Sequence, residues 1–214
     1  TNIMHKNLLF VGDSVTFGME LEPNHEKFRF SHLVATDQKF ISTENLSYHN
    51  ISKSGACNDW IVKHATQYFL QGHTCDTAII QFSAPERWSF FDAGRGFANI
   101  GNATTTNNLR TKRMKWAHLA YYTRIYTQEL ANENYWKNVF FIDEYLKDKC
   151  KTIYLTLGNP TEKTYTIKDE VIPYHYMKDV EIGSVKQIVG ESRLIGHPSK
   201  EGHRKIADYV ISKL

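Results

Sequence analysis

Short apolar runs rich in β-branched and aromatic residues recur at wide spacing along the chain. Strands buried on both faces read as continuous apolar runs, whereas half-exposed strands alternate apolar and polar residues. The pattern therefore predicts buried strands at NLLFVG (7–12), LSYHNIS (46–52), TAIIQFS (77–83) and TIYLTLG (152–158), with a further strand around VKQIV (185–189).

Longer segments with helical features lie between these runs. The segment 59–72, for example, begins with an aspartate and ends with a glycine, as helices commonly do. The predicted helices are 27–36, 59–72, 115–130, 134–149 and 199–214, the last with Ser199 as its N-cap. Strands that alternate with helices favour an α/β fold in which helices cover both faces of a mostly parallel sheet.

The length of 214 residues suits one domain, and no shift in composition marks a linker between two. We therefore expect residues 1–214 to form a single domain with two loop insertions. The insertion near 84–111 is rich in Gly, Asn and Thr, and the insertion near 159–190 has an irregular pattern. Long connections in compact α/β domains are commonly functional or inserted.

Charge and composition argue against several classes of function. The net charge of +3 is too small to indicate a nucleic-acid partner. No apolar run approaches the ~20 residues that span a bilayer. The three cysteines form no C-x-x-C and the histidines form no H-x-x-x-H pair, so we expect no disulfide framework, metal site or other cofactor.

The location of the protein is predicted only by default. No signal peptide precedes the first predicted strand, so we expect a cytoplasmic protein, and secretion by another route stays open. The sequence does not indicate the oligomeric state.

The first predicted strand stops abruptly at Gly-Asp-Ser, and Ser14 is the residue there that can carry chemistry. In an open parallel sheet, ligands bind beyond the carboxyl ends of the strands, where Ser14 and Gly55 both fall. A serine nucleophile needs a base within reach and donors for the oxyanion. His197, on a loop fixed by Pro198, is the candidate base. The backbone N–H groups of Ser14 and Gly55 are the candidate oxyanion donors.

Three stretches of the chain resemble SGNH, or GDSL-type, hydrolases: FVGDSVTFG, NISKSGACND and HPSKEGHRKIADYV. The resemblance implies a flavodoxin-like three-layer α/β/α sandwich with a mostly parallel central sheet of about five strands. It also implies that Ser14 is the nucleophile, Gly55 an oxyanion glycine and His197 the base.

The third sequence block departs from the pattern of that family. The family reads Gly-x-Asn-Asp there, whereas here Ser83 stands in the Gly place and Pro85 in the Asn place. Asn58, on the second loop, is the candidate substitute for the missing oxyanion asparagine.

The orienting acid also departs from the family pattern, because Leu194 stands three residues before His197, where the family has Asp. Two alternatives stay open. Glu191 can supply the carboxylate, or a backbone carbonyl of Leu194 or Ile195 can hold the imidazole and leave a Ser-His dyad. An acid orients and supports the base without taking the proton, so either arrangement keeps the chemistry.

Three further polar residues have mainly structural interpretations. We expect Asp13 to brace the turn through backbone hydrogen bonds. We expect His203, on the apolar side of the last helix, to be a packed core residue or a helix contact. Arg87 pairs with a surface acid in the simpler interpretation and binds a substrate anion in the other.

The resemblance implies a serine esterase that hydrolyses a small acyl ester, such as an O-acetyl group, on a small molecule or a glycan. The missing Asp and Asn favour one alternative, a weak or inactive protein that uses the same fold for binding or structure. A nucleotide- or flavin-binding domain is a third hypothesis. It requires a phosphate-cradling loop after the first strand, and the acid in GDSVTFG is misplaced for an anion.

Overall fold

The computed structural model of the chain describes residues 4–21, 24–38, 44–92, 96–100, 112–157, 164–167, 170–173, 181–190 and 197–214. The strands are β1 (Met4–Gly12), β2 (Glu44–Ser52), β3 (Thr77–Phe82), β4 (Trp88–Asp92), β5 (Gly96–Ile100), β6 (Lys151–Thr156), β7 (Thr164–Ile167), β8 (Glu170–Pro173) and β9 (Ile182–Ser184). The helices are α1 (Ser14–Phe17), α2 (His25–Phe28), α3 (Phe30–Ala35), α5 (Asn58–Leu70), α6 (Lys112–Ala120), the π-helix η2 (Tyr121–Ile125), α7 (Gln128–Leu146), α8 (Val185–Val189) and α9 (Lys200–Lys213).

Within these residues, the main sheet has five parallel strands in the order β2-β1-β3-β6-β9. Counted along the chain, this is the 2-1-3-4-5 order of flavodoxin-like folds. β1 pairs with β2 along its whole length, from Met4 opposite Glu44 to Gly12 opposite Ser52. The carboxyl ends of β1, β2 and β3 therefore lie side by side, and the loops that follow them meet at one edge of the sheet.

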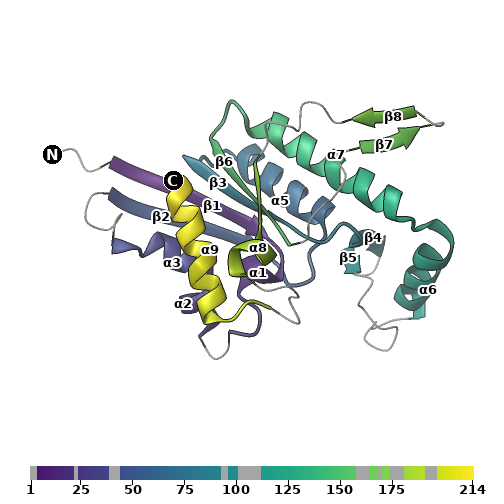
Figure 1. Cartoon of the computed structure of the whole chain (residues 1–214), viewed down its shortest axis with the longest axis horizontal. Helices are drawn as coiled ribbons and strands as arrows, with labels where there is room; N and C mark the ends of the chain where they lie inside the picture. The colour runs from purple at the N-terminus through teal and green to yellow at the C-terminus, as the bar shows by residue number, and fades with distance from the viewer. Residues whose placement is uncertain are drawn as a thin grey trace.

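Helices cover both faces of this sheet (Figure 1). Successive side chains of a strand point to opposite faces, so β1 contributes to two separate cores. Leu8 and Phe10 pack in a cluster with residues of α3, α8 and α9, whereas Leu9 and Val11 pack in a cluster with residues of α5 and α7. All four side chains are fully buried. The predicted three-layer α/β/α sandwich with a mostly parallel sheet is confirmed.

Four of the predicted strands are confirmed as β1, β2, β3 and β6, and the prediction of a strand at VKQIV is wrong. That segment forms helix α8, because Ser184 caps its start and Gly190 ends it in a left-handed conformation with φ 82°. Val185 and Val189 are buried one helical turn apart, which matches a helix face better than a strand. The fifth strand, β9, directly precedes this helix.

Three of the predicted helices are found with shifted boundaries. The prediction 59–72 corresponds to α5, 134–149 overlaps α7 as far as Leu146, and 199–214 corresponds to α9. The prediction of one helix over 115–130 is wrong, because this stretch is divided among α6, the π-helix η2 and the start of α7. Ser199 is the N-cap as predicted, since its Oγ accepts a hydrogen bond from Gly202 N at 3.2 Å. The prediction 27–36 is divided into α2 and α3 at Arg29, whose backbone is extended. Among the described residues, no helix is long and apolar enough to span a bilayer.

Antiparallel hairpins occupy parts of both predicted insertions. β4 and β5 form one hairpin. β7 and β8 form another, which lies beside α7 at the upper right of Figure 1. Residues 101–111, in the first insertion, lie outside the described part of the chain. The second insertion also contains β9, so part of it belongs to the main sheet.

Candidate active site

The turn after β1 presents Ser14 as the first residue of the short helix α1. Asp13 is the N-cap of this helix, because its Oδ1 accepts a hydrogen bond from the second N–H of the helix at 3.0 Å. This bond confirms the bracing role predicted for Asp13. Gly12 allows close packing, since a Cβ there would lie 2.8 Å from Thr16 Cβ and 2.9 Å from Gln81 Oε1. Gln81 Oε1 accepts a hydrogen bond from Asp13 N at 3.1 Å, which fixes the backbone directly before Ser14, and Ser14 itself is 2% exposed.

Asp13 also joins the first loop to the third. Its Oδ2 accepts hydrogen bonds from Ser83 Oγ and from Arg87 Nη1, both at 2.9 Å. Burial raises the pKa of Asp13 above its ordinary value, and the Arg87 guanidinium opposes this shift because it favours the charged carboxylate. Arg87 therefore pairs with an acid, but that acid is fully buried rather than at the surface. This corrects the simpler interpretation of Arg87.

The loop after β2 carries the predicted oxyanion residues. Gly55 has φ 76°, in the left-handed region that favours glycine, and a Cβ at this position would meet no atom within 4 Å. Asn58 is buried against the backbone of Ser83: its Nδ2 donates to Ser83 O at 3.2 Å, and its Oδ1 accepts from Ser83 N at 2.8 Å. This clamp accounts for the burial of Asn58 without an oxyanion role, which stays a prediction.

His197 lies just before α9 and contacts the carboxylate of Glu20. Its Nδ1 is buried 3.1 Å from Glu20 Oε1, which is close enough for an ion pair but outside the geometry of a hydrogen bond. The backbone N–H of His197 donates to the second carboxylate oxygen, Oε2, at 3.2 Å. Contact with the His197 side chain lowers the pKa of the Glu20 carboxyl below its ordinary value, so the contact favours the charged form of this group.

Glu20 belongs to the turn that directly follows α1. The neighbouring Met19 N donates to Ser14 O at 3.0 Å, so this turn is fastened to the residue of the candidate nucleophile. Glu20 was not among the site residues predicted from the sequence. Its position shortly after Ser14 in the sequence could have indicated it as a candidate. The family pattern instead predicts the orienting acid among the residues before His197.

His203 is fully buried on α9, which confirms the prediction of a packed core residue. Its Nδ1 accepts a hydrogen bond from Phe30 N at 3.2 Å, and its ring stacks on the Phe30 ring with 6.2 Å between centroids. Burial lowers the pKa of His203 to about 4, so the ring is neutral at physiological pH. These contacts fix α9 against α3, and with it the segment that carries His197.

Hydrogen bonds thus cross-link the loops after β1, β2 and β3, and the Glu20 carboxylate brings the His197 loop to the first of them. Within the described part of the chain, no hydrogen bond joins Ser14 Oγ to His197. Glu191, Leu194 and Ile195, the predicted orienting groups, lie outside the described residues. Over the described ranges, no group of three or more His, Cys, Asp or Glu side chains is arranged to hold a metal ion.

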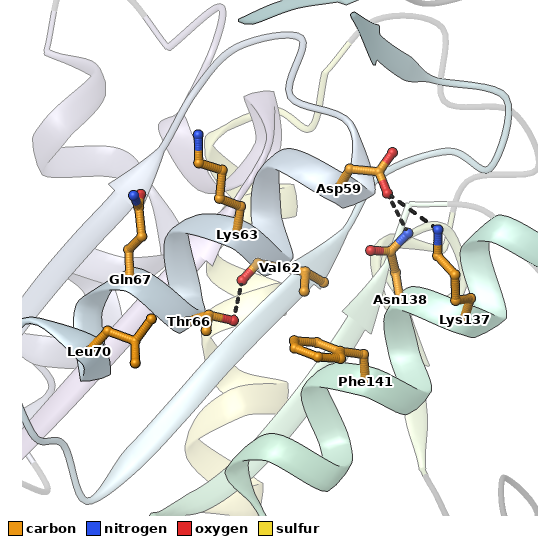
Figure 2. Close-up of a pocket in the computed structure, with 9 residues that line it drawn as sticks. All are labelled: Asp59, Val62, Lys63, Thr66, Gln67, Leu70, Lys137, Asn138 and Phe141. Carbon is orange, nitrogen blue, oxygen red and sulfur yellow. Dashed lines mark hydrogen bonds and ion pairs between the residues drawn. The ribbon is translucent and has the colours of Figure 1, made fainter. Parts of the chain in front are cut away.

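A groove of about 390 Å³ lies between α5 and α7, and Figure 2 shows the side chains that line it. Val62, Leu70 and Phe141 supply apolar walls, and at one end Asp59 accepts a hydrogen bond from Asn138 Nδ2 at 3.0 Å. The predicted site residues are not part of its lining. The groove is therefore separate from the candidate active site.

Comparison with solved structures identifies the fold. A lipolytic protein of the G-D-S-L family from Desulfitobacterium hafniense DCB-2 is 13% identical, and the match covers 98% of this chain and 99% of that chain with a TM-score of 0.54. The psychrotrophic esterase EstA from Pseudoalteromonas sp. is 13% identical, with 97% of each chain covered and a TM-score of 0.53. No protein-family model and no curated protein matches the sequence. The chain has the α/β/α fold of the SGNH, or GDSL-type, hydrolases.

Proposed function

We propose that this chain is a serine esterase that removes a small acyl group, with Ser14 as nucleophile and His197 as base. The main observation behind the proposal is the contact between His197 and Glu20. This contact brings the His197 ring to the turn that directly follows α1, the helix that begins with Ser14. The likeness in fold to an esterase and to a lipolytic protein supports the same reaction class.

The proposed reaction has two stages. Ser14 Oγ attacks the ester carbonyl carbon while His197 removes the hydroxyl proton, and the protonated ring then donates that proton to the leaving alcohol. Water then attacks the acyl-serine while His197 takes a proton from the water. The protonated ring returns that proton to Ser14 Oγ as the bond between Ser14 Oγ and the acyl carbon breaks, and the carboxylic acid is released. In apo structures, catalytic hydrogen bonds are often long and tighten only when substrate binds.

Backbone N–H groups are the proposed donors to the oxyanion. Ser14 is the first residue of α1, and the N–H groups of a first helical turn have no partner within the helix. The open space beside Gly55 supports the approach of a substrate oxygen to its N–H. Asn58 keeps one amide hydrogen beyond its bond to Ser83 and is the candidate third donor.

The proposed substrate is a small acyl ester, with an O-acetyl group on a small molecule or a glycan as the first choice. The polar composition of residues 84–111, rich in Gly, Asn and Thr, supports a polar substrate rather than a long acyl chain.

Hydrolysis of p-nitrophenyl acetate, butyrate and octanoate by the purified chain tests this proposal. We expect activity that falls as the acyl chain lengthens and is lost in Ser14→Ala and His197→Ala. Ser212→Ala, which removes an exposed serine on α9, is the matched control and should keep full activity.

Two results would contradict the proposal. Full activity in Ser14→Ala would exclude this serine as the nucleophile. A wild-type protein that neither hydrolyses these esters nor reacts with a fluorophosphonate probe would favour the alternative, a binding or structural protein on a hydrolase fold.

A further inference from the structure

We propose that Glu20 is the positioning residue that orients the His197 imidazole, in place of the aspartate that the family carries three residues before its histidine. This inference rests on the proposed function. In this arrangement the supporting carboxylate comes from the turn after α1 rather than from the segment before His197. A carboxylate from residues 191–195 is then not required.

Both carboxylate oxygens of Glu20 contact His197. Two contacts fix the direction of the imidazole ring better than one contact would. Glu20 Oε1 lies 3.1 Å from the ring Nδ1, and Oε2 accepts the backbone N–H of His197 at 3.2 Å. One oxygen therefore fixes the main chain of the histidine while the other faces its ring. A carboxylate charge 3.1 Å from Nδ1 favours the tautomer with the proton on that nitrogen, because the N–H dipole then points toward the negative charge, and it leaves Nε2 to accept the serine proton.

The backbone around Glu20 is built to hold this carboxylate. Glu20 has a positive φ of 67°. Among the described residues other than glycine, it is the one with a positive φ. Such a conformation is uncommon for a residue with a side chain, and it is kept where surrounding contacts impose it. Leu21 is buried and its N–H donates to Gly18 O at 3.3 Å, which closes the turn around Glu20.

The electrostatic surroundings support the same role. Glu20 is ionised at neutral pH, as a glutamate ordinarily is, and contact with His197 lowers the pKa of its carboxyl further. His203, the other histidine close enough to interact electrostatically with His197, is neutral because burial lowers its pKa to about 4. Among the described residues, the Glu20 carboxylate is therefore the charge paired with His197 Nδ1, and it stabilises the imidazolium formed when Ser14 is deprotonated.

The size of the effect is limited by solvent. The Glu20 side chain is 59% exposed, so water screens its charge more than in a buried triad. General acid–base catalysis contributes roughly 10²- to 10⁴-fold, and we expect Glu20→Gln to lower kcat at the smaller end, by about 10²-fold, with KM changed less than about threefold.

The test compares kcat and KM for p-nitrophenyl acetate in the wild type, Glu20→Gln, Glu20→Asp and Glu26→Gln. Glutamine keeps an acceptor for the His197 backbone N–H but removes the charge, so the fold should persist. Aspartate restores the charge on a shorter arm and should recover part of kcat. Glu26, an exposed acid at the start of α2, is the matched control and should leave kcat unchanged.

Imidazole ¹⁵N NMR of the full chain provides a readout that is independent of substrate, with His197→Ala to identify the signals. We expect His197 to carry its proton on Nδ1 in the wild type and in Glu26→Gln, and to lose this preference in Glu20→Gln.

The outcomes separate this inference from the proposed function. Hydrolysis that requires Ser14 and His197 but is unchanged in Glu20→Gln would overturn the role of Glu20 and leave the esterase standing. If the wild type hydrolyses nothing, the NMR result decides: a tautomer that depends on Glu20 supports the positioning, and an unchanged tautomer overturns it.

Discussion

The buried pair of Asp13 and Arg87 gives the sharpest prediction about stability. Arg87→Met removes the guanidinium and leaves the Asp13 carboxylate fully buried with hydrogen bonds but no opposite charge. Loss of one partner of a buried ion pair costs about 3–5 kcal/mol. The Arg87 side chain is 22% exposed, so some water reaches the pair, and we expect the lower end, about 3 kcal/mol.

The cost should depend on pH in a definite direction. Burial raises the pKa of Asp13 in the folded state, and loss of Arg87 raises it further. An acid whose folded pKa lies above its unfolded value destabilises the fold as pH rises from the unfolded value of 3.8 through the folded value. Arg87→Met should therefore be closest to the wild type in acid and furthest from it at neutral and alkaline pH.

Urea unfolding at about pH 5 and about pH 8, with thermal unfolding beside it, measures this effect. In a chain of this size, about 3 kcal/mol corresponds to a fall in Tm of about 6–12 °C. Asp13→Asn added to Arg87→Met should recover most of the loss, because it removes the uncompensated charge and keeps the cap on α1.

Lys147→Met is the matched control, since it breaks an exposed ion pair with Glu144 and should leave the free energy of unfolding close to that of the wild type. The reasoning is refuted if Arg87→Met costs no more than this control, or if its cost is the same at both pH values.

Three other predictions follow from local geometry. Gly12→Ala should destabilise the fold by about 1–3 kcal/mol in urea unfolding, because its Cβ would lie 2.8 Å from Thr16 Cβ; an unchanged midpoint would contradict the packing described. Ser199→Ala should cost about 1 kcal/mol through loss of the α9 cap, seen as a lower Tm, and Ser199→Asp should retain the wild-type value. Iodoacetamide should modify Cys150 before Cys75, because a contact between the two thiols lowers the pKa of Cys150 and raises that of Cys75; peptide mass mapping that finds Cys75 modified first would reverse this assignment.

Local patterns in the sequence were sufficient for the main sheet. Continuous apolar runs predicted β1, β3 and β6, because helices cover both faces of these inner strands. β2 lies at the edge of the sheet, with Ser47 and His49 exposed, and was predicted from its shorter apolar and aromatic pattern. The segment VKQIV was misassigned, since apolar residues at its ends fit either a strand or one helical turn. The caps at Ser184 and Gly190 decided between the two.

The candidate site was predictable where it depends on residues close to strand ends or on the family pattern, as for Ser14, Gly55 and His197. The partners of those residues were not predictable. Glu20 meets His197 from 177 positions away along the chain, and Arg87 meets Asp13 from 74 positions away. A single sequence carries no periodicity that reports such contacts, which depend on how the loops converge.

The contact between Glu20 and His197 also has a consequence for biosynthesis. It joins two segments that are far apart along the chain, as do the hydrogen bonds from Phe30 N to His203 and from Arg204 to Asp37. Domains form from the N-terminal side as the ribosome extends the chain, and contacts between distant positions form late. A nascent polypeptide would thus carry Ser14 long before it acquires a base. Under the proposed function, the growing chain is catalytically silent until the segment containing His197 and α9 has left the ribosome and docked.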